Sequence, residues 1–153
     1  MKKIFYCVII LILNSCLNKS NEVPVNLISN GKKQGLHIQY DSLGRIEIAT
    51  YVNDSLNGEY ILFHENNKRI MRKEIYEKNK EQGQAYYFYS NSSGQLMSQR
   101  EWKNGKKVGY STDFYETGET KAVLLYNEEG FLVWRKTFDT LGKVINVEEA
   151  QGK

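Results

Sequence analysis

A repeated spacing of glycine and large apolar residues is the feature that most constrains how this chain can fold. Four glycines stand 23, 25 and 26 residues apart, each with a large apolar residue seven positions before it and an aromatic residue five positions after it. The glycines are Gly35, Gly58, Gly83 and Gly109, preceded by Ile28, Tyr51, Tyr76 and Trp102 and followed by Tyr40, Phe63, Phe88 and Phe114. Because both offsets persist while the length between them varies, the pattern predicts an array of similar structural units.

Each unit has the composition of a β-hairpin. The 153 residues include 11 Tyr, 6 Phe and 2 Trp but a single Pro, and aromatic residues favour strands. A second turn, rich in Asp, Asn, Ser and Gly, follows each aromatic residue, as at 41–44 and 116–118. We therefore predict an all-β fold, a single-layer antiparallel β-meander of repeated hairpins, with units near 28–51, 52–76, 77–102 and 103–126 and a partial unit at 127–147.

Alternation of apolar and polar residues suggests which face of the sheet is buried. Leu36, Ile38 and Tyr40 would share one face, and His37 and Gln39 the other. We expect the aromatic residues that follow the repeated glycines to form the core. The charged segment 72–74 would then fit a sheet with one solvated side.

The N-terminal residues have the pattern of an export signal. Lys2 and Lys3 precede an apolar run, Ile4 to Leu13, which is too short to span a bilayer as a helix but suits a signal-peptide core. The run ends in Leu13-Asn14-Ser15-Cys16, which resembles the lipobox of bacterial lipoproteins. The resemblance implies a signal peptide at 1–15 and a lipid, such as palmitate, on Cys16. Ordinary secretion and an uncleaved N-terminal anchor are the alternatives.

This interpretation places the protein in the bacterial cell envelope, at the outer membrane, with the membrane as one partner through the lipid on Cys16. Residues 16–26 would form a flexible tether and residues 148–153 a frayed tail. Cys7 and Cys16 are the two cysteines of the chain, so the folded part would hold no thiol and no disulfide.

Charge and side-chain chemistry indicate no catalytic, metal or cofactor site. The chain has 21 basic and 18 acidic residues, and two of the basic ones lie in the predicted signal peptide. The mature protein would thus be near neutral, which argues against binding to nucleic acid. His37 and His64 occupy different repeat positions without a cysteine to complete a metal set. We therefore predict that the chain is not an enzyme.

Two groups of side chains are weak candidates for binding. Tyr60, Tyr87 and Tyr89 could form an exposed ladder on one face, although core packing is the alternative. Lysines in the turns between units could form a basic rim that faces anionic lipid headgroups or an acidic partner, although they could equally serve solubility. These lysines are Lys32, Lys33, Lys78, Lys80, Lys103, Lys106 and Lys107.

The pattern as a whole resembles the bacterial variant of the MORN repeat over roughly residues 28–147. The segments 30–35 and 104–109, the aromatic residues and the glycine-containing turns carry the match. Eukaryotic MORN units have a second glycine two positions after the first, where this chain has His37, Tyr60, Ala85 and Ser111. The resemblance implies a non-catalytic binding or scaffold module for a protein partner or an envelope surface ligand. Because bacterial members are often named antitoxins, the alternative is an antitoxin or immunity protein that neutralises a partner toxin.

Overall fold

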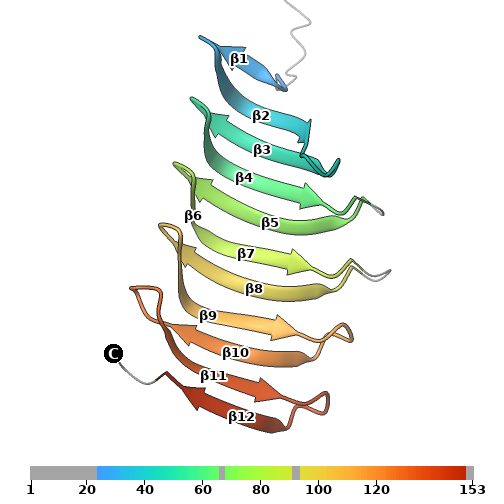
Figure 1. The fold of residues 1–153 in the computed structure, drawn as a ribbon, viewed down its shortest axis with the longest axis vertical. Helices are drawn as coiled ribbons and strands as arrows, with labels where there is room; N and C mark the ends of the chain where they lie inside the picture. The colour runs from blue at the N-terminus through green and yellow to red at the C-terminus, as the bar shows by residue number, and fades with distance from the viewer. Residues whose placement is uncertain (1–23, 66–67, 91–93, 151–153) are drawn as a thin grey trace, which may run out of the picture.

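The chain forms one open antiparallel sheet, seen in a computed structural model that describes residues 24–65, 68–90 and 94–150 (Figure 1). Successive strands lie side by side in chain order, except that β6 pairs with β5 off the main path. This confirms the predicted single-layer meander. The strands are β1 (Leu27–Ser29), β2 (Lys32–Tyr40), β3 (Ile46–Val52), β4 (Ser55–Phe63), β5 (Ile70–Glu77), β6 (Lys80–Glu81), β7 (Gly83–Phe88), β8 (Leu96–Lys103), β9 (Lys106–Phe114), β10 (Thr120–Tyr126), β11 (Leu132–Phe138) and β12 (Val144–Glu149).

Four turns on one long rim of the sheet share a conformation, whereas the fifth turn of that rim, between β10 and β11, is built on Asn127 in the same way as the Asp41 turn of the opposite rim. On the left in Figure 1, four two-residue turns have both central residues at positive φ, namely Asn30-Gly31, Asn53-Asp54, Lys78-Asn79 and Asn104-Gly105. This is the type I′ hairpin turn, whose twist matches that of the flanking strands; we call this edge the type I′ rim. At the opposite rim, the Asp41 carboxylate accepts hydrogen bonds from the backbone N–H groups of Leu43 and Arg45, both at 2.9 Å. We call that edge the Asx rim.

Successive type I′ turns are bonded to each other along their rim. The backbone N–H of Asp54 donates to the carbonyl of Lys33 at 3.2 Å, and Lys33 N–H donates back to the Asp54 carboxylate at 2.8 Å. One unit later, Asn79 and Leu56 form the same reciprocal pair, at 3.0 and 2.7 Å. The turn chemistry that starts each hairpin therefore also joins it to the preceding unit.

The repeated glycines mark backbone bends that a side chain would disturb. Gly58 has a φ of 125°, and a Cβ built there would lie 3.1 Å from Cβ of Thr50 on β3. At Gly109, with φ of 61°, a Cβ would approach the Glu101 carboxylate to 2.7 Å. The strand register shifts at both places, as in a β-bulge. At Gly58 and Gly109 the repeated glycine therefore marks a bulge, whereas the pairing of β2 with β3 passes through Gly35 without a register shift.

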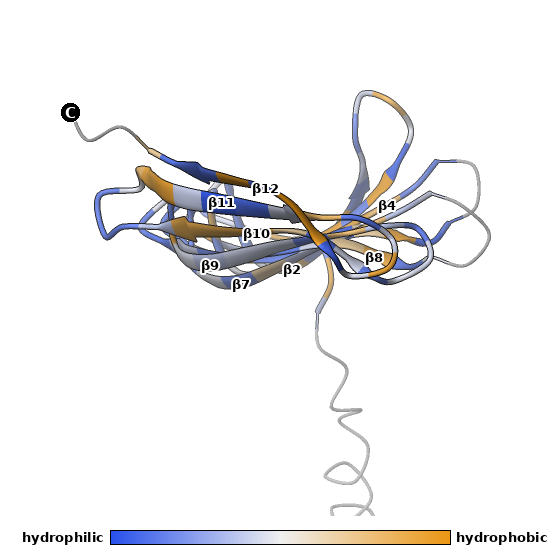
Figure 2. Ribbon diagram, turned by 90° about the horizontal axis from the view of Figure 1, so that it is seen from below, coloured by the Kyte–Doolittle hydropathy of each residue, from blue (hydrophilic) through white to orange (hydrophobic). Residues whose placement is uncertain are grey.

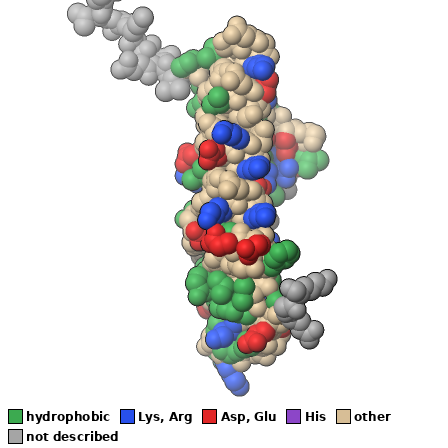
Figure 3. Space-filling model, turned by 90° about the vertical axis from the view of Figure 1, so that its left-hand side faces the viewer, with side chains coloured by type: hydrophobic (Ala, Val, Ile, Leu, Met, Phe, Trp, Pro, Cys, Tyr) green, Lys and Arg blue, Asp and Glu red, His purple; other side chains and the backbone are tan. Residues whose placement is uncertain are grey.

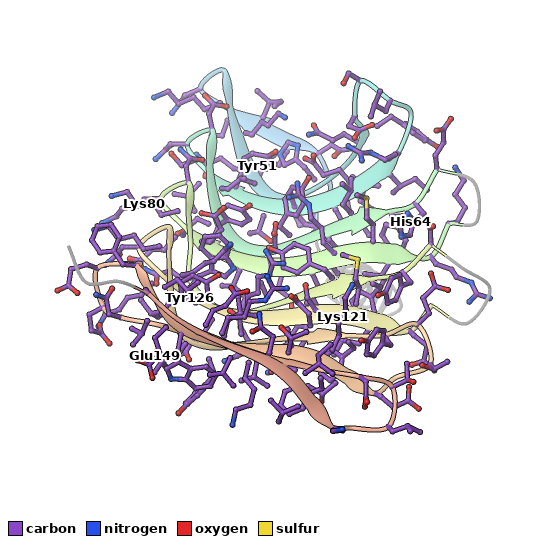
Figure 4. All side chains as sticks on the ribbon, turned by 60° about the horizontal axis from the view of Figure 1, so that its bottom comes forward. Tyr51, His64, Lys80, Lys121, Tyr126 and Glu149 are labelled. Carbon is purple, nitrogen blue, oxygen red and sulfur yellow. The ribbon has the colours of Figure 1, made fainter. Side chains whose placement is uncertain are left out.

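One face of the sheet, here called the packed face, holds the buried side chains. Its largest cluster is Ala49, Tyr51, Tyr60 and Leu62, with Leu56, Met71 and Tyr76 packed against it. Figure 4 shows Tyr51 and Tyr126 among the side chains that crowd over the sheet. Cross-strand pairing extends the face as a row through Gln39, Glu47, Leu62, Arg72, Tyr87, Ser98, Asp113, Ala122, Thr137 and Asn146.

The prediction of which side chains are buried was wrong at several positions. Tyr40, expected in the core, is 72% exposed, whereas His37 on the packed face is 3% exposed. Arg72 and Glu74, assigned to a sheet with a solvated side, belong to the packed face, and Glu74 is 2% exposed. Hydrophobic and hydrophilic residues occur together along the strands (Figure 2), so the alternation of polarity did not identify the packed face.

The other face, here called the open face, exposes large apolar side chains. Its central row contains Ile38, Ile48, Ile61, Lys73, Tyr86, Gln99, Thr112, Val123, Lys136 and Val147. Ile38 and Val147, at opposite ends of this row, are 44% and 53% exposed. Within residues 24–65, 68–90 and 94–150, no helix has the length and hydrophobicity needed to cross a membrane.

Candidate binding surfaces

A buried polar network occupies the N-terminal half of the packed face, where β3 carries its first carboxylate, Glu47. Tyr60 donates a hydrogen bond to Oε2 of Glu47 at 3.0 Å, and Tyr51 donates to Oε1 at 3.2 Å. Gln39 also donates to Oε1, at 2.6 Å. This carboxylate therefore accepts hydrogen bonds from side chains on β2, on its own strand β3 and on β4.

Glu74 on β5 is the second carboxylate of the network. Tyr76 donates to its Oε2 at 3.0 Å and Tyr87 to its Oε1 at 2.8 Å. Arg72 lies 3.5 Å from Oε2, donates to the Tyr60 hydroxyl at 3.2 Å and stacks over the Tyr60 ring. Arg72 therefore links the two carboxylate clusters.

The network suppresses ionisation of its tyrosines. Burial, followed by the charge of Glu47, raises the pKa of Tyr51 to about 12. Burial and the neighbouring Glu74 also raise the pKa of Tyr76 and that of Tyr87. These hydroxyls stay protonated at neutral pH and act as hydrogen-bond donors rather than as bases. The arrangement holds the sheet together and offers no general base among these tyrosines.

The C-terminal half of the packed face is built differently. Among the described residues, the buried Ser98 and Ser111 hydroxyls and the Trp102 indole N–H have no hydrogen-bond partner. The Lys107 ammonium group lies over the rings of Trp102 and Tyr126, at 5.8 and 5.5 Å from their centroids. Burial, followed by the charge of Arg100, lowers the pKa of Lys107. Cation–π contacts therefore take the place that carboxylates have in the other half.

The lysines predicted to form a basic rim fall into two groups, one on the packed face and one exposed at the rim. Lys33 turns onto the packed face, where its ammonium group donates to Gln39 at 2.8 Å and lies over the Tyr51 ring. Lys107 also turns onto the packed face, over the rings of Trp102 and Tyr126. Lys103 forms a 2.7 Å ion pair with Glu128. Figure 3 shows acidic and basic side chains together on the type I′ rim. The exposed lysines there are Lys32, Lys78, Lys80, Lys103 and Lys106.

The three candidate tyrosines do not form one exposed ladder. Tyr60 is buried, at 6% exposed, and Tyr87 is half-buried with its hydroxyl on Glu74. Tyr89 follows β7 and donates to the carbonyl of Phe114 at 2.8 Å. All three hydroxyls are thus engaged within the protein, and whether any of them binds a partner stays a prediction.

The two histidines are far from forming a shared site. His37 donates from Nε2 to the carbonyl of Leu27 at 3.1 Å, and His64 Nε2 lies 3.4 Å from the carbonyl of Phe88. Figure 4 places His64 at the rim opposite Lys80. Within the part of the chain that the structure describes, no group of three or more His, Cys, Asp or Glu is placed to hold a metal. Cys16, the predicted lipid attachment site, lies outside the described residues.

Sequence reasoning missed the Glu47–Arg72–Glu74 network. Arg72 and Glu74 stand two residues apart, which puts both on one face of a strand, and tyrosines recur at the facing positions of neighbouring strands. This combination was a usable signal. The signal was obscured because charged residues usually lie at solvent-exposed positions.

No family model matches this chain, and no curated protein matches it. The crystal structure of TarM is similar with a TM-score of 0.42 and 13% identity, over 69% of this chain and 19% of that one. A mutant S. aureus TarM, in complex with Fondaparinux, alpha-GlcNAc-glycerol and UDP, is similar with a TM-score of 0.37 and 11% identity, over 76% of this chain and 20% of that one. The chain thus spans about a fifth of the proteins it matches, and this likeness assigns it neither a family nor an activity.

Proposed function

We propose that this protein is a lipid-anchored, non-catalytic binding module of the bacterial envelope, whose open face docks a protein partner. The observation that carries the proposal is the exposed apolar surface along that face. Ile75 and Tyr110 are 42% and 61% exposed there, in addition to the residues at its two ends. Exposed apolar surface distributed over many strands is typical of protein interaction sites.

The chemistry of the open face favours a protein over a small ligand. Its apolar side chains are interspersed with Lys73, which pairs with Glu59 at 2.8 Å, and with Lys136. A surface on which apolar and charged side chains are mixed has the usual overall composition of non-obligate protein interfaces. Such interfaces cover about 800 Å² on each partner, which a long sheet can supply. On the packed face, by contrast, the N-terminal polar groups are already engaged within the chain.

The resemblance to the MORN repeat and to the lipobox supports the remaining parts of the proposal. A lipid on Cys16 would hold the sheet near a membrane, where the partner would be met. The antitoxin or immunity interpretation is a special case, in which the partner is a toxin. A small toxin encoded next to this chain, and captured by it, would favour that case.

Site-specific photo-crosslinking in cells tests the docking surface. A photoreactive amino acid at position 110 of the full chain should capture a defined protein, to be identified by mass spectrometry. The matched control is the same substitution for Leu141, which is 92% exposed in a turn of the Asx rim. Tyr110→Glu should abolish capture from a probe at position 75, whereas Leu141→Glu should not. Equal capture from positions 110 and 141 would overturn the proposal.

Membrane attachment is tested separately. Cys16→Ala should move the protein from the membrane fraction to the soluble fraction after ultracentrifugation, because a diacylated anchor holds a protein stably. Continued sedimentation of the variant with membranes would refute the lipid anchor without affecting the docking surface.

A further inference from the structure

The turns of the type I′ rim are held by the unit that precedes them, except for the first turn. The second residue of each later turn donates its backbone N–H to the preceding unit, and Gly105 does so to the carbonyl of Glu81 at 3.0 Å. Gly31 is the equivalent residue of the turn between β1 and β2, and among the described residues its N–H has no acceptor. β1 is the first strand of the described sheet, so no earlier turn lies beside this one (Figure 1).

The asparagine side chains of the first and the fourth turn differ in the same way. Gln82 Nε2 donates to Oδ1 of Asn104 at 2.9 Å, and the backbone N–H of Asn104 donates to Oε1 of Gln82 at 3.1 Å. The side chain of Asn30 has no hydrogen bond within residues 24–65, 68–90 and 94–150. Both asparagines are exposed, so solvent access does not distinguish them. The contacts with the preceding unit do.

The two turns are otherwise closely matched. Residues 30–33 and 104–107 have the same sequence, Asn-Gly-Lys-Lys. Asn30 and Asn104 have φ values of 51° and 53°. In each turn, glycine leaves its backbone nitrogen open to the preceding side chain because it has no Cβ. A difference in reactivity in the folded protein should therefore come from the contacts of the turns.

We propose that Asn30 is a site of spontaneous deamidation in the folded protein and that Asn104 is protected from it. Hydroxide removes the proton of the Gly31 backbone nitrogen, which attacks Cγ of Asn30. The new N–Cγ bond forms, the Cγ–Nδ2 bond breaks, and ammonia leaves with a proton from water. Water then opens the five-membered succinimide at one of its two carbonyls, which gives aspartate or isoaspartate at position 30.

The protection of Asn104 follows from what must open before the attack. The Gly105 nitrogen has to leave the Glu81 carbonyl, and the Asn104 side chain has to leave Gln82. Reactions of this kind proceed through local opening, whose free energy rises with the number of contacts that are broken. Three hydrogen bonds hold the Asn104 turn, each with a modest net contribution. The equivalent bonds are missing at Asn30 among the described residues.

Conversion to isoaspartate would change the turn itself. The main chain of isoaspartate continues through the side-chain carbon, so it is one atom longer. A two-residue type I′ turn joins two paired strands without room for an additional atom, and Ser29 pairs directly with Lys32 across this turn. β1 should therefore lose its pairing with β2 in this product.

Peptide mapping by mass spectrometry tests the proposal. The full chain is purified in detergent, incubated folded at mildly alkaline pH, and compared with the same chain in concentrated denaturant. Asn30 and Asn104 should convert at similar rates in the unfolded chain. In the folded chain Asn30 should convert at least about tenfold faster than Asn104. Equal rates in the folded chain, or an intact Asn30 after the unfolded chain has converted, would overturn the proposal.

Variants of the glutamine test the protection. Gln82→Ala should speed conversion of Asn104 at least threefold, and Gln82→Glu, which can still accept from the Asn104 N–H, should give an intermediate rate. The matched control is Gln34→Ala, which removes the equivalent 2.6 Å hydrogen bond to Asn53 and should leave the Asn104 rate unchanged. An unchanged rate in Gln82→Ala would refute the protective contact. Amide hydrogen exchange at 27–29 should be faster in the separated isoaspartate product, and unchanged exchange would refute the opening of the turn.

Discussion

The two halves of the packed face accommodate buried polar side chains with different interactions. In the N-terminal half, Glu47 and Glu74 each accept hydrogen bonds from one tyrosine on their own strand and one on a neighbouring strand. In the C-terminal half, Ser98 and Ser111 are buried without a partner among the described residues. The ion pair between Arg100 and Asp113 is 3.7 Å long and half-buried. A single-layer sheet can thus be covered by carboxylates that accept hydrogen bonds from tyrosines, although the buried Nε of Arg72 has no partner among the described residues, or by small residues beneath long cationic and aromatic side chains.

The difference has an energetic consequence. Buried polar groups stabilise a fold when every donor meets an acceptor, and removal of one member leaves the others unpaired. The N-terminal half should therefore be more sensitive to polar substitutions than the C-terminal half. The predictions below test this contrast through chemical unfolding of the purified chain, unless another measurement is named.

The largest effect is expected for Glu74→Ala. Its removal leaves the Tyr76 and Tyr87 hydroxyls without their acceptor and Arg72 without its ion-pair partner, and breaking a buried ion pair on one side costs about 3–5 kcal/mol. The matched control is Glu59→Ala, which breaks the 2.8 Å ion pair with Lys73, whose side chain is 42% exposed. Exposed pairs contribute about 0–1 kcal/mol. Equal losses of unfolding free energy for the two variants would show that the network is not structural.

A smaller effect is expected for the repeated glycines. Gly35→Ala and Gly58→Ala both place a Cβ in a positive-φ backbone region that costs about 1–3 kcal/mol for a residue other than glycine. The added Cβ at position 58 also meets Thr50 at 3.1 Å, while nothing lies within 4 Å of the one at position 35. Gly58→Ala should therefore lose more unfolding free energy. The reverse order would mean that the close contact with Thr50 is relieved without cost.

The third prediction compares one hydroxyl from each half. Tyr87→Phe removes the 2.8 Å hydrogen bond to Glu74 and should cost about 1–2 kcal/mol. Ser98→Ala removes a buried hydroxyl without a described partner, and should be neutral or stabilising by up to about 1 kcal/mol. A loss for Ser98→Ala as large as that for Tyr87→Phe would remove the distinction between the halves.

The fourth prediction concerns how the stability of the fold depends on alkaline pH. The pKa of Tyr51 is raised from 10.0 to about 12 in the folded protein, so the unfolded chain loses this proton first. The contribution of Tyr51 to stability is therefore complete below pH 10 and is lost as the pH rises from 10 towards 12. Tyr51→Phe should make the unfolding free energy fall less steeply across this window. Ultraviolet absorbance of tyrosinate, followed in the same titration, should show a smaller high-pH phase in the variant.

Much of the fold could be predicted from particular residues. Asn30-Gly31 and Asn104-Gly105 identified the turns, and the repeated glycines identified the units, because positive φ is a local requirement that few residue types meet. The pairs Asn53-Asp54 and Lys78-Asn79 adopt the same turn without a glycine. The tail was harder to judge, since Glu148 and Glu149 form the last two residues of β12.

The candidate surfaces were less predictable. The lysines of the turns share a rim, yet Lys33 and Lys107 bend onto the packed face because aromatic rings lie within reach there. Tyr60 was placed on an exposed ladder and is buried, since Glu47 and Arg72 approach it from adjacent strands. Such contacts depend on cross-strand register, which a single sequence does not specify.

The sequence by itself determined the hairpins, their order and the positions of the bends, because each follows from the backbone preferences of residues close together in the chain. The tertiary structure decided which face is packed, that Glu74 is buried between tyrosines, and that β12 pairs on one side alone among the described residues. Those properties depend on neighbours about a full unit away in the chain. On the N-terminal half of the packed face, Glu47 and Glu74 can lie among apolar side chains because tyrosines on the same and adjacent strands donate hydrogen bonds to them.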